Sequence, residues 1–342
     1  MPAGFFFCIL PVLAAASDHP VEPDSYLDST RITLVRNAEA LVLNDRFVEA
    51  DSLYCEQIRN HPDDPLGYLL RAAGLLAEMS DREENLNETL FRSLIDSTEQ
   101  LAARCLDTCD NRTAAWMYLW RGHAKAYRSL WESQFGSFMS ALKLGFAVND
   151  EYEAGLKRDS TLSDLYAGLG SYHYWKSAKA GMLSWVGIFR NERDKGIREL
   201  LKAADASLIH RDFARSALVW IRLDQKKYDS AAALSDSLQR RFPDGRTFLW
   251  PLAQARFAAE DYAAALEAYT ELRRRLIDDP GNYYNLIECD YYITKCHNWL
   301  ADNSAARASA SLLSSYNDDI PPETRRRQSS KISYLRKTAN RR

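Results

Sequence analysis

The sequence predicts an all-α protein, built from antiparallel helix pairs that repeat along the chain. Three observations support this fold class. The 342 residues include only 14 Gly and 11 Pro, the residues that most disfavour helix interiors. Hydrophobic residues make up 46% and aromatic residues 11% of the chain, which supplies a packed core and argues against extended disorder. Residues of the same type also recur at a period of 34, which suits one helix pair with its turns.

The chain begins with a segment that has features of an export signal. Residues 5–16, FFFCILPVLAAA, form an apolar run that is too short to span a bilayer, which takes roughly 20 residues. Ala14 to Ala16 supply small residues for a cleavage site, but no Lys or Arg precedes Arg31, so the usual basic start is missing. Prolines disfavour the alternative, a buried N-terminal helix. We expect residues 1–16 to be a signal peptide and 17–30 a polar linker, in a periplasmic or secreted protein.

The clearest repeats occupy residues 212–245 and 246–279. Identical residues lie 34 positions apart in four pairs: Leu218 and Leu252, Tyr228 and Tyr262, Ala231 and Ala265, and Leu238 and Leu272. The small residues allow two helices to approach closely, and the large residues fill the space to either side. One such pair cannot bury its apolar faces alone, so neighbouring pairs must stack.

This pattern resembles the tetratricopeptide repeat family. That family places Leu and a small residue on its first helix, and Ala, an aromatic residue and Ala on its second. Leu252 and Ala253 match the first helix, and residues 163–173 match another one, with His173 where Tyr is usual. The predicted packing positions are Tyr166, Leu169, Gly170, Leu218, Tyr228, Ala231, Leu252, Tyr262, Ala265 and Tyr269. The resemblance implies a right-handed α-solenoid over 31–319, and it says nothing specific about a ligand.

Weaker copies of the repeat extend the pattern to both sides. Phe47, Ala50 and Tyr54 fit a second helix near the start of the chain. Residues 283–315 fit a final pair that is shifted by about seven positions, which predicts an insertion near Asp278–Asn282.

An apolar insert at residues 176–191 interrupts one repeat. It contains six large apolar residues: Met182, Leu183, Trp185, Val186, Ile188 and Phe189. The insert either folds over the groove as part of the core, or contacts a ligand, a partner or a membrane surface.

The interrupted repeat is also loosely similar to the exported T-component of tripartite periplasmic transporters. A mitochondrial outer-membrane repeat family carries a related GF-x-x-[DE]R-x-x-G segment, which Gly187–Phe189, Glu192, Arg193 and Gly196 match in part. This similarity implies an alternative function, a solute-binding or transport-associated module.

Aromatic residues gather in 116–138 and 172–175. Most are expected to pack between helices, but Trp and Tyr need partners for their polar atoms, so some should reach a groove. The candidate binding residues are Trp120, His123, Tyr127, Tyr172, His173, Trp175, Trp185 and Phe189.

The C-terminal residues 320–342 carry eight Lys or Arg and one Glu, although the whole chain has a net charge of −3. We expect them to form a capping helix that docks through Ile332 and Leu335, because a solenoid end needs a polar outer face. The alternative is a basic tail that contacts anionic lipid, RNA or an acidic partner.

The sequence contains no GxxxxGK[ST], GxGxxG or HExxH motif, and the five cysteines after residue 16 are irregularly spaced. We therefore expect no catalytic residue, metal, cofactor or disulfide framework, and no nucleic-acid partner for the protein as a whole. The pattern favours a non-catalytic scaffold whose concave face holds an unidentified protein or peptide.

Overall fold

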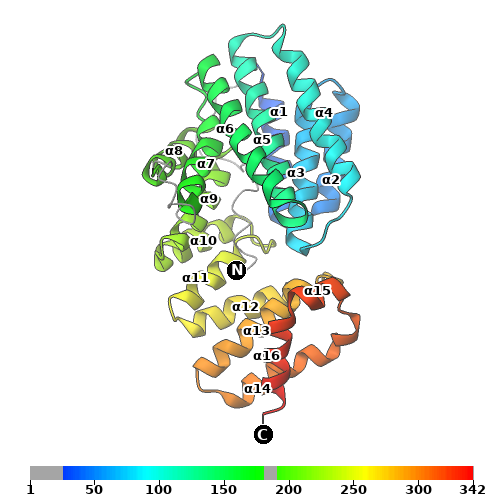
Figure 1. Ribbon diagram of the computed structural model, residues 1–342, viewed down its shortest axis with the longest axis vertical. Coiled ribbons are helices and arrows are strands. Elements are labelled where there is room, and N and C mark those ends of the chain that lie inside the picture. Colours follow the sequence, from blue (N-terminus) through cyan, green and yellow to red (C-terminus); the bar gives the residue numbers. More distant parts are fainter. Residues whose placement is uncertain (1–25, 181–190, 342) are drawn as a thin grey trace. The chain divides into compact units, whose positions relative to one another are not determined.

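The computed structural model describes residues 26–180 and 191–341, and these residues fold into helices joined by short loops (Figure 1). No β-strand occurs among them, which confirms the predicted all-α class for this part of the chain. The expected signal peptide at 1–16 lies outside the described residues, as do Trp185 and Phe189 of the insert.

Contacts divide the chain into two compact units. Unit 1 comprises the described residues within Met1–Met79 and Asn85–Ile221, and unit 2 those within Ser80–Glu84 and Arg222–Arg342. The helices α3 (Pro65–Arg82) and α9 (Arg211–Asp224) contribute residues to both units. Each unit has its own clusters of buried apolar side chains.

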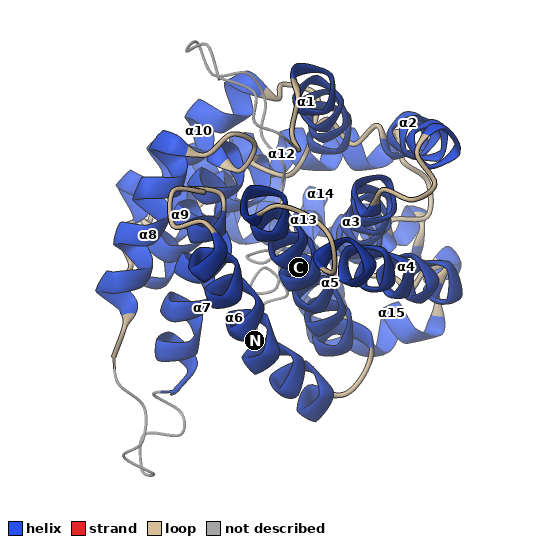
Figure 2. Cartoon of the chain, turned by 90° about the horizontal axis from the view of Figure 1, so that it is seen from above, coloured by secondary structure: helices blue, strands red, loops and turns tan. Residues whose placement is uncertain are grey.

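Unit 1 is a series of helices that pack in chain order. Besides α3 and α9 it contains α1 (Ser29–Leu43), α2 (Phe47–Asn60), α4 (Glu88–Leu106), α5 (Asn111–Phe135), α6 (Phe138–Arg158), α7 (Leu165–Ala180) and α8 (Arg193–Ala206). Helix α5 lies between α4 and α6, and Figure 2 shows these three side by side from above. Neighbours in sequence are therefore neighbours in space, as short connections between repeats require.

The helical part of unit 1 starts earlier than the sequence suggests. A linker was expected over 17–30, but α1 starts at Ser29, and both Tyr26 and Leu27 before it are buried. The carboxylate of Asp28 accepts a hydrogen bond of 2.8 Å from the backbone N–H three residues later, which caps the helix. The end of the expected linker is thus part of the core.

The helix boundaries of unit 2 repeat with the 34-residue period of the sequence. Its helices are α10 (Tyr228–Arg241), α11 (Leu249–Ala258), α12 (Tyr262–Ile277), α13 (Tyr283–Trp299), α14 (Asn303–Ser311), α15 (Pro322–Arg327) and α16 (Ser329–Ala339), with 3-10 turns η4 (Leu312–Ser315) and η5 (Asn317–Asp319). Helices α10 and α12 start 34 residues apart, and so do α11 and α13. Ala231 and Ala265, in the first turns of α10 and α12, are fully buried. These boundaries confirm helix-pair repeats of the tetratricopeptide type.

The seven-residue shift of the last repeat is taken up inside a helix. We expected an insertion near Asp278–Asn282, but only a short loop lies there, between α12 and α13. Instead α13 has 17 residues where α11 has 10. Seven residues make about two helical turns, so the lengthened helix keeps the same face toward its neighbours.

The predicted packing positions divide into two groups by exposure. The buried ones are Leu169, Gly170, Leu218, Ala231, Ala265 and Tyr269, and the half-buried ones are Tyr166, Tyr228, Leu252 and Tyr262. Gly170 of α7 faces Gly196 of α8 so closely that a Cβ at either position would lie 2.5–2.7 Å from the other residue's carbonyl oxygen. Only glycine permits this approach of the two helix backbones.

The basic C-terminal segment is folded onto unit 2. Ile332 and Leu335 of α16 are buried in one cluster with Ile287 of α13 and Leu313 of η4. Figure 1 shows α16 lying along α13 and α14. This arrangement agrees with the interpretation of 320–342 as a cap. None of the helices in the described ranges is long and apolar enough to cross a membrane.

Candidate functional site

The sequence-predicted binding residues of α5 face the core of unit 1. Trp120, His123 and Tyr127 are spaced three and four residues apart, so they share one face of the helix. All three are buried, and they therefore offer no open surface to a ligand. Their part in binding stays a prediction, because packing alone accounts for their position.

Four polar side chains form a continuous hydrogen-bonded chain beside these residues. The Tyr152 hydroxyl lies 2.6 Å from His123 Nδ1, His123 Nε2 lies 2.9 Å from His210 Nε2, and His210 Nδ1 lies 2.8 Å from Asp164 Oδ1. Tyr152, His123, His210 and Asp164 are all buried. The chain links α6, α5 and the segments that precede α9 and α7.

The contacts of Asp164 determine where the protons lie in this chain. Its carboxylate also accepts three backbone N–H groups, from residues 208–210, so it is the accepting end. With both imidazoles neutral, His210 donates through Nδ1 and accepts at Nε2, so His123 donates through Nε2 and accepts the Tyr152 proton at Nδ1. Burial, and then the adjacent His210, lower the pKa of His123 well below its ordinary value, in agreement with a neutral ring. These four hydrogen-bonded side chains hold helices together, and because all four are buried, a substrate cannot reach them.

Two glycines leave the space that the Tyr152 ring occupies. A Cβ at Gly122 of α5 would lie 2.2 Å from the Tyr152 ring, and one at Gly168 of α7 would lie 2.3 Å from it. The ring therefore fits between two helix backbones where no side chain is possible.

The predicted residues of α7 are partly accessible. His173 is buried, with Nδ1 2.6 Å from Glu199 and Nε2 3.0 Å from the Lys195 ammonium. Trp175 is also buried, and Tyr172 is half-exposed with the Lys176 ammonium 5.0 Å from its ring. Of these three predicted residues, Tyr172 exposes the most surface.

The residues that carry the loose transporter similarity have structural contacts here. The Glu192 backbone N–H donates to the Ser177 hydroxyl at 2.8 Å, and Arg193 donates to the Ala178 carbonyl at 3.3 Å. Together with the Gly170–Gly196 approach, these bonds fix the start of α8 on the end of α7. The transport-associated alternative stays a prediction.

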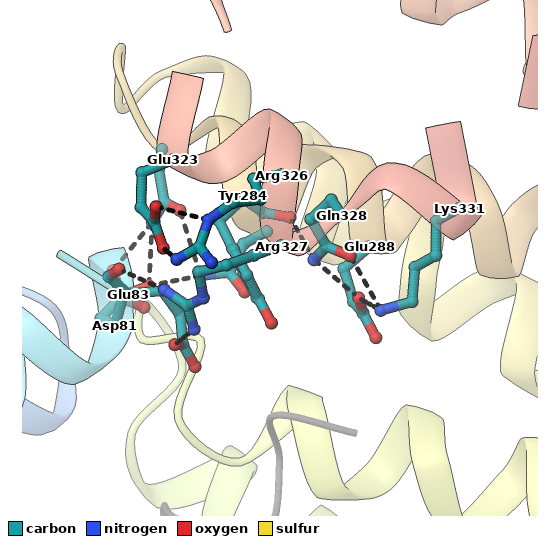
Figure 3. A network of polar contacts seen from close by, with 11 residues as sticks. Asp81, Glu83, Tyr284, Glu288, Glu323, Arg326, Arg327, Gln328 and Lys331 are labelled. Carbon is teal, nitrogen blue, oxygen red and sulfur yellow. Dashed lines mark hydrogen bonds and ion pairs between the residues drawn. The ribbon is translucent and has the colours of Figure 1, made fainter. Parts of the chain in front are cut away.

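Unit 2 contains a buried ionic network around the first two turns of α13 (Figure 3). Arg327 of α15 donates to the Glu83 carbonyl at 2.9 Å and pairs with its carboxylate, and its guanidinium lies 4.4 Å from the Tyr284 ring centroid. Glu288 pairs with Lys331 of α16 in the same way. Burial raises the pKa of Glu83 although Arg327 opposes the shift, so this carboxylate depends on its partner.

A second part of the network is centred on Asp81. Arg246 pairs with Asp81 at 2.7 Å and with Asp279 at 2.9 Å, and Asn282 donates to Asp81 at 3.2 Å. Burial also raises the pKa of Asp81. These side chains tie distant parts of unit 2 together and serve its architecture.

A continuous series of aromatic rings in unit 2 runs from half-buried positions against the core to the surface. We call this the aromatic face, and its members are Tyr334, Tyr291, Tyr292, Phe257, Tyr262, Trp299 and the cation Lys295. Successive ring centroids, in that order from Tyr334 to Trp299, are 5.0–5.5 Å apart. Trp299 stacks on Tyr262 with an interplanar angle of 6° and is 61% exposed. The rings of this face come from α11, α12, α13 and α16.

Lys295 gives the aromatic face a positive charge. Its ammonium lies 5.1 Å from the Phe257 ring centroid and 5.3 Å from that of Tyr291, within the range of a cation–π contact. It has no ion pair within 4.0 Å among the described residues. The aromatic face was not predicted from the sequence, although Tyr291, Lys295 and Trp299 follow one another at four-residue spacing, which marks one side of a helix.

Unit 1 has a smaller exposed apolar patch on the first turns of α6. Phe138, Met139, Leu142 and Phe146 form this patch, and Phe138 is 71% exposed. Their spacing places them along one side of the helix. Phe138 and Met139 are the most exposed of the four, and Leu142 and Phe146 are partly covered.

Known proteins give fold-level similarity only. No family model matches the sequence, and no curated protein matches it. Among solved structures, the C-terminal part of a TPR repeat-containing protein from Cytophaga hutchinsonii is 18% identical with a TM-score of 0.41, over 84% of this chain and 97% of that one. The TPR domain of P58(IPK) is 11% identical with a TM-score of 0.26, over 91% and 99%. The class of protein, a tetratricopeptide-type helical-repeat protein, rests on the chain's own 34-residue helix pairs.

The described residues contain no group of three or more His, Cys, Asp or Glu side chains that could hold a metal ion. The five described cysteines are free thiols.

Proposed function

We propose that this protein is a non-catalytic scaffold that binds a protein or peptide partner, and that the aromatic face of unit 2 is a binding surface. The observation that carries the proposal is the uninterrupted series of six rings ending in the exposed Trp299. Tyr and Trp are enriched at interfaces because they bury a large apolar area with few rotatable bonds and keep a polar atom for hydrogen bonding.

The charge of the face supports the same proposal. Lys295 contacts two rings and has no carboxylate partner within 4.0 Å among the described residues, so its charge is available to an incoming ligand. Leu300, next to Trp299, is also exposed, so an apolar area continues beyond the rings. A partner would cover this area and gain the free energy of burying it.

Photo-crosslinking in the native host tests the proposal. A photoreactive amino acid at position 299 is compared with one at Glu267, an exposed residue of α12 outside the face. We expect a dominant adduct with one protein from position 299 only. Equal adducts from both positions, or none from 299, would overturn the assignment.

A substitution gives the second test. Trp299→Ala should weaken the complex found by crosslinking by roughly 30-fold, the loss typical of an interface hot spot. Because Trp299 is largely exposed, thermal unfolding of the free protein should change little. A variant that binds like the wild type would remove Trp299 from the interface.

We also propose export, on the basis of the apolar run 5–16 and the small residues at 14–16. Mass spectrometry of the protein from its native host would then show a mature chain that starts at Ser17. A chain that retains residues 5–16 would contradict export by a cleaved signal.

A further inference from the structure

The Lys and Arg residues of the C-terminal segment 320–342 fall into two groups, those with an ion-pair partner and those without one among the described residues. Three of them are neutralised within unit 2: Arg326 by Glu323, Arg327 by Glu83 and Lys331 by Glu288. The other described ones are Arg325, Arg336, Lys337 and Arg341, and none makes an ion pair within 4.0 Å of a described carboxylate. Charge pairing within the protein therefore leaves one side of α15 and α16 unneutralised.

Two of these arginines converge on one neutral acceptor. The Asn317 side-chain oxygen accepts a hydrogen bond from Arg336 at 2.7 Å and another from Arg325 at 3.2 Å. Arg325 also donates to the Asn317 backbone carbonyl. Each guanidinium has five N–H groups, so both keep donors for a further acceptor. Two like charges are thus held close together by a group that cannot neutralise them.

The converging arginines border a hollow of about 500 Å³ along one side of α16. Its lining residues are Arg325, Ser329, Ile332, Ser333, Arg336, Lys337 and Asn340. They supply three cations, two hydroxyls and one amide, and no carboxylate. The acidic residues that precede it in the sequence, Asp318, Asp319 and Glu323, do not line the hollow.

We propose that this hollow is a binding site for a small, phosphate-bearing anion. The guanidinium fork matches the geometry of phosphate oxygens, Lys337 adds a third positive charge, and the serine hydroxyls can donate further hydrogen bonds. A volume of about 500 Å³ lies within the range of small-molecule sites. The hollow is open to solvent, and its three cations lie along one side of α16, so a small soluble anion can reach all of them.

Calorimetric titration of the full chain with inorganic phosphate and with pyrophosphate, at constant ionic strength, tests the site. We expect saturable binding that Arg336→Gln and Arg325→Gln each weaken roughly tenfold, as the loss of a charge-assisted hydrogen bond implies. Arg326→Gln is the matched control, because it removes the same charge from the same segment but lies outside the hollow.

Three results would overturn the proposal. The first is a wild-type chain without saturable binding of either probe. The second is an equal loss in Arg326→Gln, which would mean diffuse attraction of anions to a basic surface. The third is flotation with phosphatidic acid vesicles that Arg336→Gln abolishes while soluble phosphate does not compete, which would assign the hollow to a membrane headgroup.

The two soluble probes distinguish sources of the anion. Tighter binding of pyrophosphate than of phosphate would support a ligand with two linked phosphates, and equal binding would support a single phosphate group. Circular dichroism and thermal unfolding of Arg336→Gln and Arg325→Gln check that each variant remains folded, so that a loss of binding reports on the site.

Discussion

At the residue scale, the fit of Tyr152 between two helices leads to a prediction for Gly122. An added methyl group would lie 2.2 Å from the Tyr152 ring, so Gly122→Ala must displace the ring and break its bond to His123. We expect a loss of about 2–4 kcal/mol in the free energy of unfolding, from overpacking and the broken polar chain. Urea denaturation measures this difference.

Gly145→Ala on α6 is the matched control. A Cβ there meets nothing closer than the Ser129 hydroxyl at 3.9 Å, so the methyl group fits. Alanine in a helix is favoured over glycine by up to about 1 kcal/mol, and this variant should be neutral or stabilised. Equal losses in both variants would show that the Tyr152 contact is not the cause.

The buried side chain of His123 predicts how stability depends on pH. The groups around His123 are Tyr152 of α6, His210, Asp164 beyond it, and Trp120 and Tyr127 on its own helix. Burial and His210 lower the pKa of His123 in the folded protein, whereas an unfolded histidine has a pKa of about 6.5. Stability from this residue is therefore present above about pH 6.5 and falls below it, by up to about 1.4 kcal/mol per pH unit.

Hydrogen exchange of peptides from α5 and α6 between pH 5 and pH 7.5 measures this effect within unit 1, after correction for the intrinsic rate. His123→Gln should remove much of the pH dependence. His61→Gln, at an exposed position, should leave it unchanged. A His123→Gln chain with the wild-type pH dependence would show that other groups cause it.

At the element scale, the network around α13 predicts the effect of removing one cation. Arg246→Met leaves the buried Asp81 without its ion-pair partner, whereas Asp279 keeps its pair with Arg82 at 2.6 Å. Breaking a buried ion pair on one side costs about 3–5 kcal/mol, because a buried charge stays behind. We expect a loss of that size in the unfolding of unit 2, measured by hydrogen exchange in α12 and α13.

Two controls accompany this variant. Arg326→Met breaks an exposed pair with Glu323 and should have little effect. Asp81→Asn in the Arg246→Met background removes the uncompensated charge and should recover part of the loss. An Arg246→Met chain as stable as Arg326→Met would mean that the network contributes little.

The elements also show what the sequence could predict. The period of 34 and the small residues at Ala231 and Ala265 predicted helices α10 and α12, because these signals are local and repeat. The seven-residue shift was also visible, but its placement inside α13 was not. The ionic network could not be predicted, since Asp81 and Arg246 lie 165 positions apart and no periodic pattern joins them.

The candidate binding residues show the same limit of prediction from sequence. An aromatic-rich stretch predicted binding residues on α5, but α13 is also rich in aromatic residues, and both helices bury one side. Trp120 and Trp299 differ in exposure only because of the helices packed around them. The four-residue spacing of Tyr291, Lys295 and Trp299 did mark a shared side of α13, but spacing alone does not say whether that side is covered.

At the scale of the whole molecule, the basic C-terminal segment serves both stability and recognition. Its apolar residues complete the core of unit 2, three of its cations neutralise glutamates, and Arg325, Arg336 and Lys337 line the hollow. The net charge of +7 in this segment therefore does not indicate one function, because its cations have different roles. The sequence suggested two alternatives, a cap or a basic tail, and the structure gives the segment the contacts of a cap with a basic outer side.

This double role predicts the result of ending the chain at Asp319. Ile287 and Leu313 would lose the cover of Ile332 and Leu335, and Glu83 and Glu288 would lose their cations. We expect hydrogen-exchange protection to fall in α13 and α14, since a terminal repeat depends on its cap. The full-length double variant Arg336→Gln/Lys337→Gln should keep that protection while losing charge from the hollow. Wild-type protection in the truncated chain would show that 320–342 is a dispensable tail. If instead protection falls, deleting this segment cannot separate binding from folding, and only charge variants can show what the hollow binds.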